Sequence, residues 1–338
     1  MKCFDVTAMG ELLIDFIQYG MSEQGNPLFE ANPGGAPCNV LSMLSGLSDK
    51  VAFIGKVGDD SFGYILRDSL VEQGIDTTGL RYDNKIHTTL ALVHKLDNGD
   101  RDFSFYRKPG ADMCLTAEEI DEELIAGSKI FHFGSLSLTD EAVRGATMKA
   151  LNVAHDNDVI VSFDPNLREP LWESLEEAKA QIDVGMKNCS IMKISDNEIT
   201  WFTGIEDYDA AADYIMKNYP DIKLMMLSLG KDGSRAFYRT VKAADNSLPD
   251  LSGDIISVTV PAFIQEGTIE TTGAGDTFMG SMLHHVLLYG LDGFDEENLV
   301  TALTFANAAA SIITTRKGAL RVMPKSEEVE AFLRERRG

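Results

Sequence analysis

The residues best suited to chemistry lie between Glu270 and Thr277, in the order Glu-Thr-Thr-Gly-Ala-Gly-Asp-Thr. Glycines let a backbone turn tightly and let a ligand approach its amides. The apolar run that follows, 278–288, is predicted to be a helix whose first N–H groups point into the turn and can bind an anion. Asp276 would repel a phosphate there, but it suits a base that takes a proton from a hydroxyl attacking a phosphate. The alternative is that Asp276 only caps the helix.

The elements that would position this stretch alternate between strands and helices from about residue 128 onward. The predicted strands are 129–133, 159–163, 191–194 and 223–229, and the predicted helices lie near 140–155, 174–186, 208–217, 276–289, 297–313 and 326–336. Apolar strands that alternate with amphipathic helices predict an α/β fold, in which helices cover both faces of a parallel sheet. The sequence shows no internal repeat and no clear domain break.

Polar side chains gather where these strands end, and ligands of such sheets bind beyond the carboxyl ends of the strands. They are Asp164, Asn166 and Arg168 after one strand, Lys193, Ser195 and Glu198 after the next, and Gly230 to Gly233 after the third. Arg168 and Lys193 are among the few cations there, so both are candidates to neutralise a phosphate. The alternatives are a structural ion pair for Arg168 and a solvated lysine for Lys193.

Two features near the N-terminus could bind a ligand. Asp15 lies in an otherwise apolar run, either as a ligand-binding carboxylate or as a solvent-facing residue of an edge strand. Further on, Gly34-Gly35 is predicted to form a turn that leads into a helix. Pro37 suits the first turn of that helix, where its missing N–H costs nothing. Asn39 follows in the same turn, with its amide near the two glycines.

Residues 88–96 and 102–106 are predicted to form a β-hairpin. Asn98-Gly99 between them suits the positive φ angles of a type I′ turn. An antiparallel hairpin inside a chain of βα units indicates an appended piece, either a flap or a dimer contact.

The composition is that of a globular protein, and it narrows the range of partners. Of 338 residues, 44% are hydrophobic and 25% are charged. The net charge of −23 argues against binding to nucleic acid or to anionic membranes. No apolar run approaches the roughly 20 residues that span a bilayer, and no signal peptide is visible, so we expect a cytoplasmic protein. The four cysteines are far apart, which predicts reduced thiols rather than a zinc site.

Two common nucleotide-binding motifs are excluded. The run from Gly273 to Phe278 does not match GxGxxG and lies late in the chain, which disfavours a dinucleotide fold. No GxxxxGK[ST] sequence occurs, so the chain has no P-loop. A phosphate site here must therefore be of another kind.

Taken together, the motifs are much more specific than each alone. Gly34-Gly35-x-x-x-Asn39 near the N-terminus and Thr-x-Gly-Ala-Gly-Asp at 271–276 resemble the two signatures of the ribokinase-like, PfkB carbohydrate kinase family. The further matches, in the order that the family shows, are Gly10, Asp15, Leu229-Gly230-x-x-Gly233 and the run 305–310. The resemblance covers nearly the whole chain.

This resemblance implies a three-layer α/β/α ribokinase-like fold with a mostly parallel central sheet and a small β lid. Residues 1–338 would form a single kinase domain, with the lid built from about 12–33 and 88–107. Because the lid sheet would be exposed, a homodimer is compatible with this arrangement.

Within the family, three strings resemble the fructokinase branch. They are Asp164-Pro165-Asn166-Leu167-Arg168 with Leu171-Trp172, Lys193-x-Ser195-x-x-Glu198, and Arg107-x-Pro109-Gly110-Ala111-Asp112-Met113. The resemblance thus favours transfer of phosphate from ATP to fructose, which makes fructose 6-phosphate. Kinases of aminoimidazole riboside, ribose or 2-keto-3-deoxygluconate remain alternatives, although Ser195 replaces the Asn of ribokinases. A non-catalytic sugar- or nucleotide-binding relative is the alternative of another class.

The residues and the resemblance together predict three sets of contacts. Asp276 would be the catalytic base, Gly273 would belong to the turn before it, and the amides of Ala274, Gly275 and Asp276 would form an anion hole. The predicted sugar-binding residues are Asp15, Gly34, Gly35, Asn39, Arg107 and Arg168. The predicted nucleotide-binding residues are Lys193, Ser228, Gly230, Gly233 and Asn307.

The implied cofactors are ATP and Mg²⁺, and Glu198 would help to place the magnesium through water. The family usually has Asp where this chain has Glu270, and that acid often takes part in a monovalent-cation site beside the anion hole. The carbonyls of 315–319, which would complete the site, are present. One extra methylene could shift or abolish the site, so potassium activation stays an open question.

Overall fold

A computed structural model describes residues 2–95, 101–240 and 253–337 of the chain. The strands of its large sheet are β1 (Phe4–Met9), β4 (Val51–Gly58), β5 (Asp76–Asp83), β8 (Ser128–Gly134), β9 (Ile160–Asp164), β10 (Ile191–Ser195), β11 (Leu224–Ser228), β12 (Ser234–Arg239) and β13 (Ile255–Val260). Within the described residues the sheet has nine strands in the order β13-β12-β11-β10-β9-β8-β1-β4-β5. Neighbours pair in parallel from β11 to β5, whereas β12 and β13 pair antiparallel at one edge.

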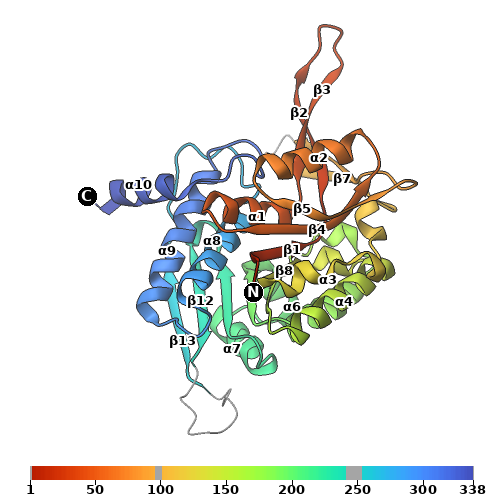
Figure 1. The fold of residues 1–338 in the computed structure, drawn as a ribbon. Coiled ribbons are helices and arrows are strands. Elements are labelled where there is room, and N and C mark those ends of the chain that lie inside the picture. The colour runs from red at the N-terminus through yellow and green to blue at the C-terminus, as the bar shows by residue number, and fades with distance from the viewer. Residues whose placement is uncertain (1, 96–100, 241–252, 338) are drawn as a thin grey trace.

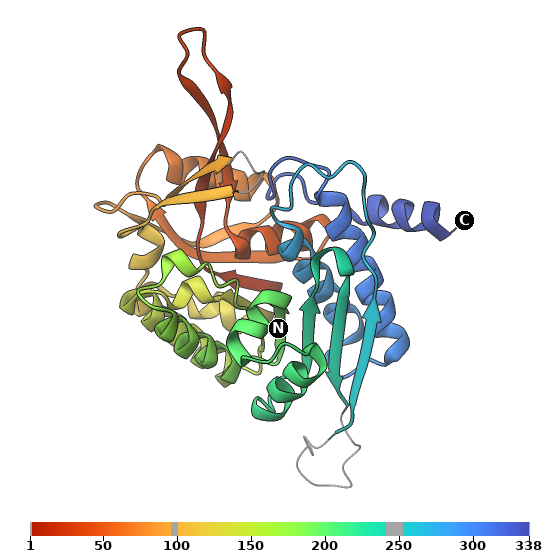
Figure 2. The same cartoon turned by 180° about the vertical axis from the view of Figure 1, so that it is seen from behind.

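Helices cover both faces of this sheet, as Figures 1 and 2 show from opposite sides. On one face lie α1 (Ala36–Gly46), α2 (Ser61–Glu72), α8 (Ala274–Tyr289) and α9 (Glu296–Ile313). On the other lie α3 (Glu122–Ala126), α4 (Glu141–Asp156), α5 (Leu175–Lys187), α6 (Asp196–Thr203) and α7 (Tyr208–Asn218). The last helix, α10 (Ser326–Arg337), packs against α9. The predicted three-layer α/β/α arrangement is therefore confirmed.

A smaller sheet stands at one edge of the molecule. Its strands are β2 (Leu13–Met21), β3 (Pro27–Gly34), β6 (Leu90–Lys95) and β7 (Arg101–Tyr106), in the order β3-β2-β6-β7. The β2–β3 hairpin projects well away from the body of the protein (Figure 1). The predicted hairpin corresponds to β6 and β7, which form an antiparallel pair. Strand β6 begins at Leu90 rather than at 88, and residue 96 and the predicted turn at Asn98-Gly99 lie outside the described residues.

Side-chain alternation along two central strands decides which polar residues reach the α8 side of the sheet. Phe163 of β9 and both Met192 and Ile194 of β10 lie in the core formed with α3 to α7. Successive side chains of a strand point to opposite faces. Asp164 and Lys193 therefore face the layer that contains α1 and α8.

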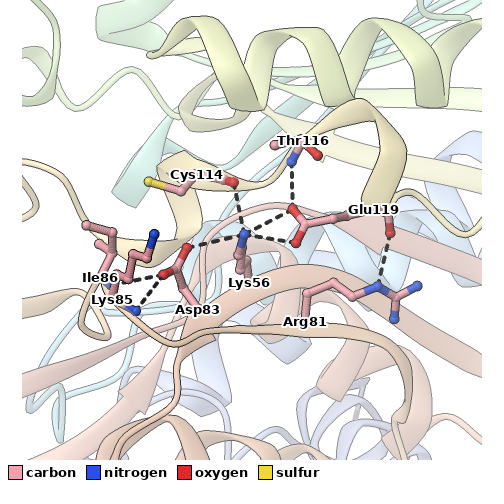
Figure 3. A network of polar contacts seen from close by, with 8 residues as sticks. All are labelled: Lys56, Arg81, Asp83, Lys85, Ile86, Cys114, Thr116 and Glu119. Carbon is pink, nitrogen blue, oxygen red and sulfur yellow. Dashed lines mark hydrogen bonds and ion pairs between the residues drawn. The ribbon is translucent and has the colours of Figure 1, made fainter.

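An ion-pair network holds the segment that follows β7 against the large sheet (Figure 3). The ammonium of Lys56, on β4, lies 2.9 Å from Glu119 and 3.3 Å from Asp83, and it donates a 3.2 Å hydrogen bond to the carbonyl of Cys114. These partners come from the end of β5 and from the short 3₁₀ helices 111–114 and 117–119. The network thus fixes where the chain leaves the small sheet.

One predicted helix begins elsewhere in the structure, and two strands of the large sheet were not predicted. Helix α8 begins at Ala274 rather than at 276, because Gly273 takes a left-handed conformation and ends the preceding turn. The antiparallel strands β12 and β13 were not predicted. They follow a reversal of the chain at Gly233, whose φ of 102° favours glycine.

Candidate active site

The glycine-rich stretch forms a tight turn into α8. Gly273 precedes the helix with a φ of 76°. The amide of Ala274 donates to the carbonyl of Thr271 at 3.2 Å, so this amide belongs to the turn. The first amides of a helix have no carbonyl partner within the helix. This leaves Gly275 and Asp276, rather than all three predicted residues, as the amides best placed to bind an anion.

Asp276 lies in the first turn of α8 and is buried. Its Oδ2 accepts a 2.8 Å hydrogen bond from Nδ2 of Asn39, which belongs to α1. The two helices approach closely, since a Cβ on Gly280 would lie 2.9 Å from a backbone carbonyl of α1. Burial raises the pKa of the Asp276 carboxyl, although the bond from Asn39 and the charges of Lys193 and Arg168 oppose the shift. Asp276 therefore does more than cap the helix, whose cap is Gly273.

The turn at Gly34-Gly35 lies beside two acids. A Cβ on Gly34 would lie 2.6 Å from Oδ2 of Asp15, so the absence of a side chain lets this carboxylate approach. Gly35 precedes α1 with a φ of 135°. Glu11 accepts a 2.7 Å hydrogen bond from the amide of Ala36 and so holds the start of α1. Asp15 is half-buried rather than solvent-facing.

Arg107 is buried at the end of the small sheet. Its Nε donates to Oδ2 of Asp112 at 2.7 Å, and its Nη2 donates to the carbonyl of Leu136 at 3.1 Å. Its Nη1 is buried without a hydrogen-bond partner among the described residues. The guanidinium lies close enough to Glu11 to act on it: burial raises the pKa of Glu11 to about 7, and the charge of Arg107 opposes that rise.

The two predicted phosphate-binding cations differ in environment. Arg168 is exposed and has a φ of 46°, and its charge acts on Asp276. Lys193 is buried, and its Nζ lies 2.9 and 3.2 Å from the two carboxylate oxygens of Asp164. The alternative of a solvated lysine at position 193 is therefore wrong. The same Nζ would lie 3.1 Å from a Cβ on Gly275.

A cavity of about 350 Å³ opens beside the start of α8. Of the predicted nucleotide-binding residues, Ser228, Gly230, Gly233 and Asn307 line it, together with Ala274 and Gly275. The Asn307 amide donates to the carbonyls of Val260 and Pro261 at 3.1 Å, so Asn307 shapes the wall of the cavity. Lys193 is not among the lining residues.

The two predicted metal-binding acids are both engaged. Glu198 accepts hydrogen bonds from the amides of Ser195 and Leu167, each at 2.9 Å, and from the hydroxyl of Ser195 at 2.7 Å. Glu270 is buried and accepts a 2.9 Å hydrogen bond from the amide of Gly318. No group of three or more His, Cys, Asp or Glu side chains that could hold a metal occurs in the part of the chain that the structure describes.

Two residues in this region were given no role from the sequence. Glu11 fixes the start of α1, and Asp164 pairs with Lys193. Asp15 was singled out because it is an acid within an apolar run, and the same pattern describes Glu11. Asp164 was placed at a strand end, but nothing in the sequence paired it with a lysine 29 residues further on.

A buried carboxylate in the first turn of a helix, next to glycine amides and a cavity of small-molecule size, is the arrangement of a kinase that phosphorylates a hydroxyl group. The model of the family described as "pfkB family carbohydrate kinase" matches residues 4–326. The chain therefore belongs to the PfkB family of carbohydrate kinases, as the sequence motifs predicted, and it is a sugar kinase.

Particular relatives are fructokinases. The chain is 40% identical to fructokinase-1 of Zea mays over 328 residues, which are 96% of each protein. It superposes on the crystal structure of a fructokinase with bound ATP from Xylella fastidiosa with a TM-score of 0.87, at 29% identity and 99% coverage of both chains. A fructokinase from Vibrio cholerae, solved with fructose, ADP and a calcium ion, gives a TM-score of 0.82 at 28% identity, with 98% of this chain and 99% of that chain covered.

None of the helices in the described residues is both long and apolar enough to cross a bilayer.

Proposed function

We propose that this protein is an ATP-dependent fructokinase, which converts fructose and ATP to fructose 6-phosphate and ADP. The observation that carries the proposal is the hydrogen bond from Asn39 to the buried carboxylate of Asp276, beside a cavity that Gly275 lines. Fructokinases in plants and bacteria that match almost the full chain support the choice of sugar.

Asp276 would act as the general base. Its carboxylate would accept the proton of the C6 hydroxyl of fructose while that oxygen attacks the γ-phosphorus of ATP. The bond from the γ-phosphorus to the bridging oxygen breaks, and ADP leaves. The amides of Gly275 and Asp276 would hold the transferring phosphoryl oxygens, and Lys193 and Arg168 would neutralise their charge.

The sugar would lie between the large and small sheets. Asp15 and the backbone at Gly34-Gly35 would bind its hydroxyls. The Oδ1 atom of Asn39 suits one of them, because it is buried without a hydrogen-bond partner among the described residues. In the same way the unpartnered Nη1 of Arg107 suits a sugar oxygen. The small sheet would act as a lid that excludes water from the phosphoryl group.

The nucleotide would occupy the cavity that Ser228, Gly230 and Gly233 line. Magnesium, when bound, would supply positive charge that neutralises the ATP phosphates. The residues present fit such an ion. Glu198 is a carboxylate near Lys193, and its three hydrogen bonds leave it suited to contact the ion through water. We also propose a cytoplasmic location, which the free, buried thiols of Cys38 and Cys189 support.

An ADP-release assay over a panel of substrates tests the proposed function. The panel contains fructose, glucose, ribose, aminoimidazole riboside and 2-keto-3-deoxygluconate, each with ATP and magnesium. We expect the highest kcat/KM with fructose. A higher value with another member would change the substrate, and no ADP release with any member would leave a binding protein as the better description.

We propose that potassium is not required for turnover. The carboxylate of Glu270 reaches the amide of Gly318, and the amides of Ile269 and Glu270 both donate to the carbonyl of Thr314. The longer acid thus bonds to a segment whose carbonyls would otherwise face a cation. We expect equal kcat in potassium chloride and in tetramethylammonium chloride at the same ionic strength. Strong activation by potassium would contradict this, and Glu270→Asp, with its shorter side chain, is the matched variant.

We further propose a homodimer formed through the β2–β3 hairpin. Tyr19 is 72% exposed and Met21 58% exposed on β2, and Phe29 of β3 is also exposed. Exposed apolar side chains on a projecting hairpin indicate a surface that binds another protein. The simplest arrangement with closed symmetry is a dimer in which these three side chains are buried against a second copy of the chain. Phe29→Glu should convert dimer to monomer in light-scattering measurements. Tyr214→Glu, at an exposed tyrosine on α7, is the control and should leave the mass unchanged.

A further inference from the structure

A buried ion pair lies next to the first turn of α8, and one of its two members, Asp164, has been given no role above. Lys193 and Asp164 have side chains that are 8% and 5% exposed. Both carboxylate oxygens of Asp164 lie within 3.2 Å of the ammonium. The pair comes from neighbouring parallel strands, one residue beyond the paired residues Phe163 and Met192.

Asp164, rather than the nearby Glu198, determines where the ammonium lies. The Glu198 carboxylate accepts hydrogen bonds from Leu167 and from both the amide and the hydroxyl of Ser195, so it is bound to the start of α6. It acts on Lys193 only through its charge. Burial favours the neutral form of each partner: it raises the pKa of Asp164 to about 7, and the charge of Lys193 opposes that rise. For Lys193 the carboxylates of Asp164 and Glu198 outweigh burial and raise the pKa of the ammonium, so it stays charged.

The ammonium is directed at Gly275. A Cβ at this position would lie 3.1 Å from Nζ and 3.8 Å from Cε of Lys193. Apart from the neighbouring residues and the backbone of the same helix, it would meet no other atom of the described residues within 4 Å. A Cβ contact of 3.1 Å is tighter than nine in ten of those that occur. The glycine therefore provides room for a positive charge beside an amide of the proposed anion hole.

We propose that Asp164 is a positioning residue for phosphoryl transfer: it holds the Lys193 ammonium beside Gly275, so that the ammonium and the Gly275 amide together meet the transferring phosphoryl group. This inference rests on the proposed function and deepens it. A fixed positive charge stabilises the transition state more than a mobile one, because no reorganisation is needed as negative charge develops. Gly275 is the third residue of this arrangement, because its lack of a side chain leaves room for the ammonium.

Three variants test this role, with the sugar that gives the highest turnover. Lys193→Met should lower kcat by about 10²–10³-fold, as for loss of one preorganised group at a developing charge. Asp164→Asn, which keeps size and removes the charge, should lower kcat by up to about 10²-fold through misplacement of the ammonium. In both variants KM for the sugar should change little. Asp156→Asn, at an exposed aspartate of α4, is the control for the same chemical change.

The combined variants separate positioning from a merely structural effect. If Asp164 acts through Lys193, the double variant Asp164→Asn/Lys193→Met should have the kcat of Lys193→Met alone. Gly275→Ala should lower kcat, and this loss should vanish when Lys193 is already Met. Gly145→Ala controls for the substitution, because a Cβ on that helical glycine meets nothing within 4 Å.

The kcat values of these variants decide whether Asp164 positions Lys193. Unchanged kcat in Asp164→Asn, or effects of Asp164 and Lys193 that multiply, would overturn the inference. If the buried-pair variants do not fold, the single variant Gly275→Ala decides: kcat equal to that of Gly145→Ala would overturn the inference. A wild type that turns over no sugar in the panel contradicts the proposed function. If the wild type is active and one of the overturning results is found in the variants, only the role of Asp164 is contradicted.

Discussion

Asp276→Asn is expected to lower kcat by about 10²–10⁴-fold while fructose still binds, because a positioned general base contributes that much to proton transfer. Asparagine keeps the shape of the side chain and can still bond to Asn39 after rotation of an amide. The measurement is steady-state ADP release, combined with calorimetric binding of fructose. Turnover within about tenfold of the wild type would show that Asp276 is not the base.

The pH dependence of the same reaction gives an independent check. Burial raises the pKa of Asp276 above its usual value, which is about 3.9 in model peptides. Since the base must be ionised, kcat/KM of the wild type should fall as the pH drops through this raised pKa. The residual activity of Asp276→Asn should lack that acid limb. Asp59→Asn, at an exposed aspartate that follows β4, should keep the profile of the wild type.

Asp15→Ala is expected to raise KM for fructose by about 10²–10³-fold, with a smaller effect on kcat. Hydrogen bonds to a charged group are worth about 1.5–3 kcal/mol each, and a half-buried carboxylate beside the Gly34-Gly35 turn can accept one or two from sugar hydroxyls. KM for ATP should stay the same, because the cavity near Gly230 is formed by other elements.

Glu30→Ala is the matched control for Asp15→Ala. Glu30 is an exposed acid on β3, further out along the same hairpin, so its removal changes the charge equally without touching the turn. Equal effects of the two substitutions on KM would indicate a general electrostatic influence. An unchanged KM in Asp15→Ala would remove Asp15 from the sugar site.

The fold class followed from the sequence because its signals are local. Apolar strands alternating with amphipathic helices from residue 128 onward specify a covered parallel sheet, and the structure has one. The edge strands β12 and β13 were missed, since short strands next to a turn lack a distinctive pattern. The start of α8 was placed two residues late, because the left-handed conformation of Gly273 cannot be distinguished in the sequence from a helical glycine.

The residues of the candidate site that could be predicted from the sequence are those that belong to the family motifs. Asp276, the predicted base, and Asn39, a predicted sugar-binding residue, lie 237 residues apart, and a hydrogen bond joins them in the folded chain. Four of the five predicted nucleotide-binding residues line one cavity. Glu11 and Asp164 were missed as partners, because their roles depend on contacts with Ala36 and Lys193 that no local pattern encodes.

The sequence by itself determined the family, the order of strands and helices, and the acid in the glycine-rich turn, because each of these depends on residue types at short spacing. The tertiary structure decided which groups surround that acid. It buried Asp276 under α1, bound the amide of Ala274 into the turn, and placed the Lys193 ammonium against Gly275. Such placements depend on strand register and helix packing across the sheet, and these arise only when the whole chain is folded.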